Sequence, residues 1–308
     1  MAETRRLKEL VAGTLDASRF PDAPLLVALS GGADSAALAL LAVETRVQVR
    51  AAYVDHGTPH APLLRAAAEK VAAGLDLPLL VLDSGLAGQF TEDLARKARY
   101  RALLGALADD EWLVTGHSLD DQVETVLMNV VRGAGLSGLS GIPERTTDRV
   151  ARPLLGIRRS ELREVATLAG LGFVDDPSND DDSFTRNRIR HEVLPLLADI
   201  NPAVVRSLAR VADAAGADDY LLERLTDELP VTLGEGACTT PVSVIEIAPP
   251  PIADRLLRRM VRHLRPPYSP TADEVGRIRD VAAGRSARAE LEGGVVVASE
   301  AGMLRISV

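Results

Sequence analysis

The chain has almost no cysteine and no long hydrophobic run. Cys238 is the one cysteine in 308 residues, which excludes an internal disulfide framework and any site built on paired cysteines. Every apolar run is broken well before the roughly 20 residues that a membrane-spanning helix needs. The start, Met-Ala-Glu-Thr-Arg-Arg, contains no apolar signal core. These absences predict a water-soluble protein of the cytoplasm without a membrane partner.

Positive charge is scarce over the chain as a whole. The formal net charge of −9 at pH 7 argues against attraction of the whole surface to nucleic acid, although local patches can still bind it. Between residues 252 and 290, however, there are nine arginines and five acidic residues. Four of these arginines at helical spacing are candidates for RNA contact: Arg255, Arg258, Arg259 and Arg262. The alternative, a solvated helix face with a leucine-rich side packed inward, is equally compatible with the pattern.

The most informative segment is an apolar run that ends in a glycine loop. Residues 25–29 read as a buried strand, and Ser30-Gly31-Gly32-Ala33-Asp34-Ser35 follows directly. Glycines let successive backbone N–H groups approach an anion, and the helix that follows presents its positive end to the loop. The sequence therefore predicts a polyphosphate ligand. The alternative is an Asp/Ser helix cap after an ordinary turn.

This loop resembles the SGGxDS loop of the N-type ATP pyrophosphatases, the PP-loop family. It lacks the Gly-Lys-Ser/Thr ending of a Walker A loop. The resemblance implies ATP cleavage between the α- and β-phosphates, with Mg²⁺ held by Asp34, and with Asp120 as a second candidate ligand. It also implies ATP contacts from residues of three segments: Ser30, Gly31, Gly32, Ala33, Asp34, Ser35, Asp55, His56 and His117.

The first half alternates strands and helices as a doubly wound parallel sheet requires. Strands are expected at 25–29, 47–54, 79–82 and 112–115, with helices at 35–44, 63–74 and 94–107. In such α/β sheets the ligand lies beyond the carboxyl ends of the strands. Asp55-His56-Gly57 ends the second strand, and Gly116-His117 follows the fourth. We therefore expect these polar residues to line one site.

The segment 117–125 combines a histidine with three acids. If a helix begins at Asp120, then Asp121 and Glu124 lie three residues apart on one helix face. Such a group suits magnesium or an amine. The alternative is a helix N-terminus whose acids favour the macrodipole and need no ligand.

The joint pattern resembles the tRNA(Ile)-lysidine synthetase family. The matching motifs are SGGADS, VDHG, ARKARY from Ala95, HSLDDQVET, RGAGLSGL from Arg132, RPLL from Arg152, DPSN from Asp176 and RNRIR from Arg186. The resemblance implies an adenine nucleotide α-hydrolase-like fold. It also implies a ligase that adenylates the wobble cytidine of tRNA(Ile) with a CAU anticodon and then joins free L-lysine to C2. The products would be lysidine, AMP and pyrophosphate, and decoding would change from AUG to AUA.

This reaction assigns roles to the acids and arginines. Lysine's amine, with an ordinary pKa of about 10.4, must lose a proton before it attacks, so a carboxylate must hold it. Asp121 and Glu124 are the candidates, with Asp34 a third. Four arginines are expected to clamp phosphates or RNA: Arg99, Arg190, Arg96 and Arg186. For each of them the alternative is a surface ion pair, and for His56 and His117 it is a structural strand-end histidine.

The chain also departs from the family pattern after Gly57, where a Leu-Arg or similar pair and a longer arm are expected and Thr58-Pro59-His60 instead runs almost directly into the next helix. The acidic run at 180–182 is expected to be a solvated loop.

The expected domains are 1–200, catalytic, and 201–308, a small and mainly helical tRNA-contacting domain without a further domain after it. Asn201-Pro202 should begin a helix through Arg210. Residues 232–240 and 249–251 read as a linker or small subdomain. Two helices and a terminal hairpin should follow. Relatives suggest a homodimer.

Three other functions are alternatives to lysidine formation for a chain with this loop. A tRNA thiolase with the same loop needs paired cysteines or an iron–sulfur cluster, and NAD or GMP synthetases lack the ARxxRY and RNxIR signatures. A non-catalytic nucleotide sensor should have lost Asp34, Asp121 or Glu124, and all three are present.

Overall fold

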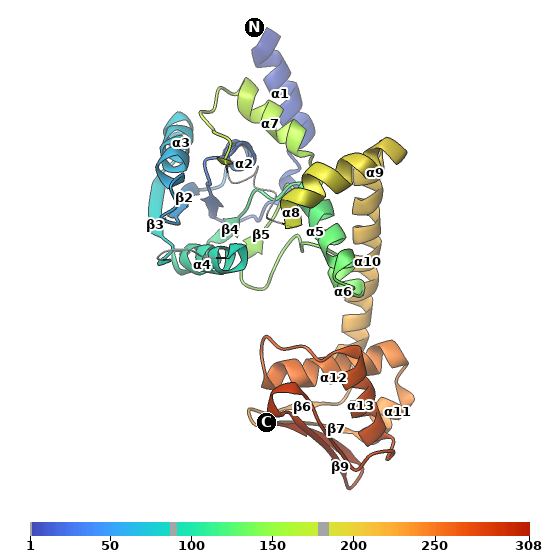
Figure 1. The fold of residues 1–308 in the computed structure, drawn as a ribbon. Helices are drawn as coiled ribbons and strands as arrows, with labels where there is room; N and C mark the ends of the chain where they lie inside the picture. Colours follow the sequence, from blue (N-terminus) through green and yellow to red (C-terminus); the bar gives the residue numbers. More distant parts are fainter. Residues whose placement is uncertain (1, 87–90, 178–184) are drawn as a thin grey trace. The chain divides into compact units, whose positions relative to one another are not determined.

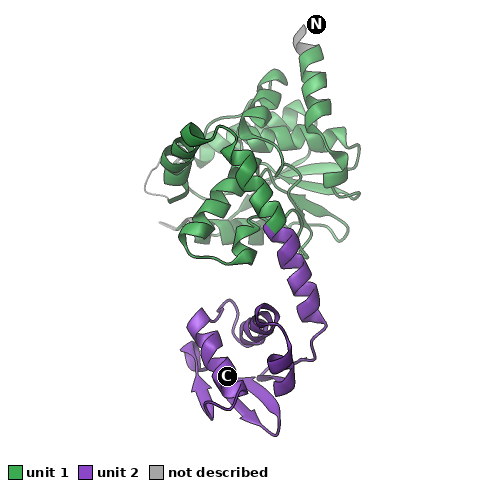
Figure 2. Ribbon diagram, turned by 90° about the vertical axis from the view of Figure 1, so that its right-hand side faces the viewer, with its two compact units in different colours: residues 1–214 green, residues 215–308 purple. Residues whose placement is uncertain are grey.

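A computed structural model describes residues 2–86, 91–177 and 185–308. The predictions for Ser178, Asn179 and the acidic run 180–182 lie outside these residues. The chain forms two compact units, residues 1–214 and 215–308 (Figure 2). The division falls inside a single helix, α10 (Val204–Asp227), rather than at residue 200.

The first unit is built on a parallel five-stranded sheet of order β3-β2-β1-β4-β5. Its strands are β1 (Leu25–Ala28), β2 (Val49–Asp55), β3 (Leu79–Asp83), β4 (Trp112–Val114) and β5 (Val150–Ala151). The order reverses between β1 and β4, which is where a doubly wound sheet opens its ligand crevice. The predicted fold class is confirmed, and the short β5 is an addition to it.

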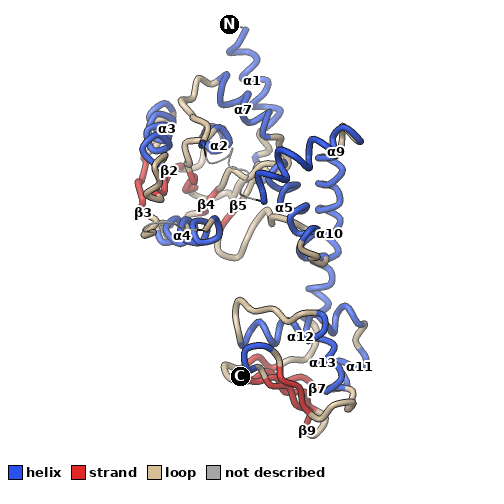
Figure 3. The backbone as a smooth tube through the Cα atoms, viewed as in Figure 1, coloured by secondary structure: helices blue, strands red, loops and turns tan. Residues whose placement is uncertain are grey.

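The helices of the first unit cover both faces of this sheet (Figures 1 and 3). They are α1 (Ala2–Thr14), η1 (Ala17–Arg19), α2 (Ala33–Glu44), α3 (Ala61–Gly74), α4 (Glu92–Gly105), α5 (Leu119–Val131), α6 (Leu136–Leu139), α7 (Arg159–Leu168), α8 (Thr185–Arg188), η3 (Ile189–Val193) and α9 (Leu194–Ile200).

Alternate residues of β1 enter two different cores, as burial on both faces requires. Leu25 and Val27 pack with α2 and α7, whereas Leu26 packs with Leu103 of α4. A third cluster joins α5 to η3, α9 and the start of α10. α5 is thereby fixed beside the carboxyl ends of β4 and β5, where its first turn reaches the site.

The second unit is mainly helical by residue count and also contains an antiparallel sheet of order β6-β7-β10-β9-β8. Its strands are β6 (Thr232–Leu233), β7 (Ala237–Pro241), β8 (Arg288–Glu290), β9 (Val296–Glu300) and β10 (Met303–Ser307). Its other elements are α11 (Val242–Ile247), α12 (Pro250–Leu264), α13 (Ala272–Ala282) and the short η4 (Glu292–Gly294).

The two predicted helices and the terminal hairpin of this unit are confirmed as α12, α13 and β9-β10. The segment expected as a linker or small subdomain supplies β6 and β7 of the sheet, and β7 pairs with β10. Leu256, Leu257 and Met260 of α12 are fully buried in the core of this unit. In the described part of the chain, every helix is too short or too polar to cross a membrane.

Candidate active site

The glycine loop lies between β1 and α2, as the sequence predicts. Gly31 has φ of +87°, and a Cβ built on it would lie 2.3 Å from the Leu64 carbonyl oxygen. Gly32 is the N-cap of α2 and makes no side-chain cap, so the first backbone N–H groups of the helix are free of a capping side chain. Only glycine fits at position 31, and the loop leaves donors for an anion.

Ser35 holds the loop closed from inside. The Ser30 N–H and hydroxyl both donate to Ser35 Oγ, at 3.1 and 3.0 Å, and that hydroxyl donates to the Gly32 carbonyl at 2.9 Å. Ser35 is 5% exposed. Its role in this structure is to shape the loop.

Asp34 points its carboxylate toward the first residues of α7. Its Oδ2 accepts from Arg159 Nε at 3.3 Å, whereas Oδ1 is buried and makes no hydrogen bond with the residues that the structure describes. Burial raises the pKa of Asp34 to about 6, although the Arg159 charge opposes this. An unpaired carboxylate oxygen in a phosphate loop is suited to a cation or a substrate donor.

Two of the predicted acids, Asp120 and Asp121, occupy the first turn of α5, which begins at Leu119, and Glu124 follows in the next turn. Ser118 caps the helix: Asp121 Oδ2 accepts from the Ser118 N–H at 2.8 Å and from its hydroxyl at 2.6 Å. The Asp120 carboxylate instead contacts the start of α7. Both of its oxygens accept from Arg158 Nε, and Oδ2 also accepts from the Arg159 N–H. Asp121 therefore serves both as a helix cap and as a member of the site.

Three arginines enclose Asp121 and the completely buried Glu124. Arg159 donates to Glu124 Oε1 at 3.2 Å and to Asp121 Oδ1 at 2.9 Å. Arg186 donates to Glu124 Oε2 at 2.7 Å and to Asp121 Oδ1 at 3.1 Å, and Arg190 donates to both oxygens of Glu124. We call these six residues the carboxylate–arginine cluster: Asp34, Asp121, Glu124, Arg159, Arg186 and Arg190.

The formal charges of this cluster balance, three against three. Burial would raise the pKa of Asp121, but the Arg159 and Arg186 guanidinium groups outweigh it and hold that pKa well below its usual range. Burial alone would lower the pKa of Arg159. The charges of Asp121, Glu124 and Asp34 outweigh burial and raise this pKa above its usual value. Asp121 is thus ionised under all ordinary conditions.

Sequence reasoning missed Arg158 and Arg159, which begin α7. No motif marks them, because their role depends on where the tertiary fold places the start of α7. The one local signal is Glu161 at the third helical position, whose carboxylate accepts from the Arg158 N–H; it indicates a helix start but no site. Arg186 and Arg190 were expected at phosphates, and in this structure they pair with the acids.

The ends of β2 and β4 carry the two predicted histidines. Asp55 Oδ1 accepts from the Gly57 N–H, forming a tight turn around His56. Burial and the Arg99 charge lower the pKa of His56. His117 Nδ1 lies 2.8 Å from Thr115 Oγ1, and burial lowers its pKa to about 3. Both histidines are neutral near pH 7.

The ARxxRY motif lies on α4. Arg96 and Arg99 lie 5.4 and 5.9 Å from the centre of the Tyr100 ring, close enough for cation–π contacts. The charges of both arginines also act on His117. This places the α4 arginines near the ends of β2 and β4.

The segment that directly follows the RGAGLSGL motif, residues 140–142, has a structural role. Gln122 of α5 donates from Nε2 to the Ser140 carbonyl and accepts at Oε1 from the Ile142 N–H at 2.6 Å. A Cβ on Gly141 would lie 2.5 Å from Gln122 Oε1. The segment therefore folds back onto the helix that carries Asp121 and Glu124.

The four candidate tRNA arginines lie on α12 of the second unit. Arg255 pairs with Asp219 and Glu223, Arg259 pairs with Glu223 and Asp227, and Arg258 donates to the Pro270 carbonyl. Arg262 is exposed. Three of the four thus contribute to the folding of this unit, and Arg262 presents its charge to solvent.

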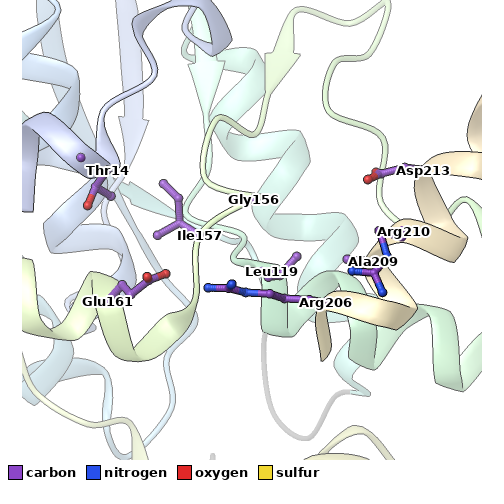
Figure 4. A pocket seen from close by; sticks show the side chains of 10 residues that line it. Thr14, Leu119, Gly156, Ile157, Glu161, Arg206, Ala209, Arg210 and Asp213 are labelled. Atoms are coloured by element: carbon purple, nitrogen blue, oxygen red, sulfur yellow. The ribbon is translucent and has the colours of Figure 1, made fainter. Parts of the chain in front are cut away.

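A separate cavity of about 420 Å³ lies in the first unit (Figure 4). Arg206, Arg210 and Asp213 of α10 line it together with Leu119 and Glu161. None of the predicted site residues contributes to its wall.

Comparisons with known proteins agree with this geometry. The model of the PP-loop domain family matches residues 2–197. The tRNA(Ile)-lysidine synthase of Methylococcus capsulatus is 37% identical over 276 residues, which cover 85% of this chain and 63% of the relative. That of Polaromonas naphthalenivorans is 40% identical over 261 residues, which cover 78% of this chain and 76% of the relative. The chain therefore spans less than two thirds of the first relative's length.

A solved structure also has a similar fold. The U34-tRNA thiolase NcsA from Methanococcus maripaludis, with its 4Fe–4S cluster, has a TM-score of 0.54 and 18% identity, covering 69% of this chain and 79% of the thiolase. At this identity the similarity concerns the fold alone.

Proposed function

Because the chain belongs to the tRNA(Ile)-lysidine synthase family, we propose that it joins L-lysine to the wobble cytidine of tRNA(Ile) with a CAU anticodon, using ATP. One observation carries the proposal: Arg159 bonds at once to Asp34 of the glycine loop and to Asp121 and Glu124 of α5. The phosphate loop and the acids suited to an amine therefore share one site, as two successive half-reactions require.

In the first half-reaction, O2 of the cytosine attacks the α-phosphorus of ATP. A bond forms from O2 to phosphorus, the bond to the β-phosphate oxygen breaks, and pyrophosphate leaves. The N–H groups at the start of α2 are placed to bind the departing pyrophosphate, and the loop is pre-shaped by Gly31 and Ser35. Arg99 and Arg96 of α4 are proposed to contact phosphates of ATP or RNA.

In the second half-reaction, the unprotonated amine of lysine attacks C2 of the adenylated cytidine. The C2–N bond forms, the C2–O2 bond breaks, AMP leaves with O2, and the nitrogen loses a proton. Asp121 and Glu124 are proposed to bind the lysine ammonium group by charge before this step. The low pKa of Asp121 makes it a weak base, whereas the raised pKa of Asp34, about 6, favours Asp34 as the proton acceptor.

Binding of lysine requires the cluster to rearrange. Asp121 and Glu124 are satisfied by Arg159, Arg186 and Arg190 in this structure, so an ammonium group must displace at least one guanidinium. A released arginine would then be available to a phosphate, because its charge loses its acidic partner. This exchange couples the predicted phosphate clamps to the predicted amine site.

The residues at the loop fit one magnesium contact. The buried, unpaired Oδ1 of Asp34 would hold Mg²⁺, whereas both oxygens of Asp120 are engaged by Arg158. When bound, Mg²⁺ would neutralise charge on the pyrophosphate.

Contact of the second unit with tRNA, a homodimer and a cytoplasmic location remain predictions. Among the α12 arginines, exposed Arg262 is the one we propose for tRNA.

Exchange of labelled pyrophosphate into ATP tests the first half-reaction without lysine. We expect exchange only when the isoleucine tRNA transcript with a CAU anticodon is present, and we expect Asp34→Asn to abolish it. Exchange that proceeds equally without tRNA would contradict adenylation of the RNA base. A folded protein that binds ATP without any exchange would favour a nucleotide-binding module.

A further inference from the structure

A buried arginine at the carboxyl end of β5 has no part in the reaction described above. Arg152 follows β5 directly, is 5% exposed, and begins the RPLL motif. Its Nη1 donates to the Pro143 carbonyl at 2.7 Å, and its Nη2 lies 3.4 Å from the Tyr100 hydroxyl. Its Nε is buried and makes no hydrogen bond within the described ranges. Its hydrogen-bond partners among the described residues are neutral, so none of them supplies a counter-charge to the guanidinium.

Two further arginines, Arg96 and Arg99, lie near the same hydroxyl, and the Asp121 carboxylate acts on the neighbouring His117. The charges of Arg152, Arg96 and Arg99 all act on Tyr100 and on His117. Among the residues that the structure describes, neither Arg152 nor Arg96 forms an ion pair. Burying a cation without a compensating charge is costly. A group of arginines around one hydroxyl is therefore suited to an anion from outside the chain.

The position of Arg152 separates it from the phosphate loop. The loop follows β1, and β4 lies between β1 and β5. Because neighbouring strands lie about 4.8 Å apart, β5 is roughly 10 Å from β1 along the edge of the sheet. The second predicted nucleotide segment, Asp55-His56, follows β2 on the opposite side of β1. Arg152 thus lies across β4 from the glycine loop and from Asp55-His56, and its charge acts on one of the predicted ATP contacts, His117.

The backbone around Arg152 is firmly held. Its N–H donates to the Glu144 carbonyl at 2.8 Å, and the 142–144 segment is anchored through Ile142 to Gln122 of α5. The guanidinium is therefore fixed relative to the helix that carries Asp121 and Glu124. A fixed fork of N–H donors matches the oxygens of a phosphate.

We propose that Arg152, together with Arg96 and the Tyr100 hydroxyl, binds one backbone phosphate of the RNA beside the nucleotide that reacts. This inference rests on the proposed function, since it takes RNA as the acceptor. It adds a separate phosphate contact that positions the wobble nucleotide.

Equilibrium binding of a fluorescent tRNA(Ile) transcript, without ATP or lysine, tests this contact. For Arg152→Gln we expect a Kd about tenfold higher than for wild type. We also expect the slope of log K against log salt to become shallower by about 1, as for one lost phosphate contact. The affinity for ATP, measured separately by calorimetry, should not change.

Arg149 offers a matched control at the other end of β5. It is also an arginine, and it donates to the Ala108 and Glu111 carbonyls at the amino edge of the sheet. Arg149→Gln should leave the tRNA affinity and the salt slope unchanged. Tyr100→Phe should weaken binding without changing the slope, because a hydroxyl releases no counterion.

Substitution of a second arginine, Arg96, tests the same contact if Arg152→Gln does not fold. Arg96 is only partly buried and forms no ion pair with the residues that the structure describes, so Arg96→Gln should fold normally and also reduce the salt slope. Unchanged tRNA affinity in the folded arginine variants would overturn the inference. Loss of ATP affinity with unchanged tRNA affinity would overturn it too, because the phosphate would then belong to ATP. If wild type still exchanges pyrophosphate in either case, the proposed function stands and only the inference fails.

Discussion

Arg190 donates to both carboxylate oxygens of Glu124, from Nε to Oε1 at 2.7 Å and from Nη2 to Oε2 at 3.1 Å. Glu124 is completely buried, and two further arginines bond to the same oxygens. One buried carboxylate thus forms ion pairs with arginines from α7, α8 and η3. The first half of α5 is consequently part of the folding core as well as of the site.

Glu124→Gln should therefore destabilise the protein as well as inactivate it. Breaking a buried ion pair leaves uncompensated charge, and we expect the free energy of unfolding to fall by about 3 kcal/mol. Glu192→Gln is the control, because the exposed Arg188–Glu192 pair is worth only about 0–1 kcal/mol. Urea unfolding of the three proteins measures both effects. Equal stability of Glu124→Gln and wild type would show that the cluster is not structural.

Gly31→Ala should damage the loop rather than the fold. The added Cβ would meet the Leu64 carbonyl oxygen at 2.3 Å, so the loop backbone must move, and we expect ATP affinity to fall by at least roughly tenfold. Gly85→Ala is matched, with φ of +69° but nothing within 4 Å of its Cβ. In both variants an alanine with positive φ costs about 1–2 kcal/mol of backbone strain. Only in Gly31→Ala does the added Cβ also clash with another atom. Similar ATP affinity in both would contradict a phosphate site at Gly31.

Stability should decrease as the pH falls below the ordinary pKa of histidine. Burial lowers the pKa of His117 from 6.5 to about 3, so the folded state keeps this histidine neutral while the unfolded chain takes up a proton. The effect is absent above pH 6.5 and grows until about pH 3. At pH 5 we expect wild type to have lost about 1–2 kcal/mol from this group.

His117→Gln removes that contribution and so provides the comparison. Its free energy of unfolding should change less than that of wild type between pH 7 and pH 5, when both are measured by urea unfolding. Identical pH profiles would mean that His117 is protonated in the folded protein.

Variants of two α12 arginines should distinguish a residue that stabilises the fold from one that binds tRNA. Arg255 is largely buried and pairs with Asp219 and Glu223, so Arg255→Gln should lower stability by about 1.5–3 kcal/mol. Arg262 is exposed, so Arg262→Gln should change stability by no more than about 0.5 kcal/mol. If Arg262 contacts tRNA, its variant should also make the salt dependence of binding shallower by about 1. An unchanged slope would exclude that contact.

The sequence predicted those parts of the candidate site whose geometry depends on neighbouring residues along the chain. The glycine loop, the strand ends at Asp55 and His117, and the helix that carries Asp121 and Glu124 all follow from short patterns whose geometry is fixed within a few residues. The alternation of strands and helices then placed them at one edge of a parallel sheet.

The missing parts depend on contacts between distant segments. Arg159 reaches Asp34 across 125 positions of the chain, and no spacing rule connects them. Arg186 and Arg190 were predicted to clamp phosphates or RNA, and their pairing with Glu124 is a property of the tertiary fold. In the second unit, β7 contains two threonines and a proline, so its sequence is typical of a linker until β10 pairs with it.

Incorporation of labelled lysine into tRNA tests the central claim most directly. The account predicts ATP-dependent incorporation into the isoleucine transcript with a CAU anticodon, none into a methionine tRNA, and none with Asp34→Ala. Absence of incorporation by folded wild type that still exchanges pyrophosphate would contradict lysine as the second substrate and leave a different ATP-dependent ligase.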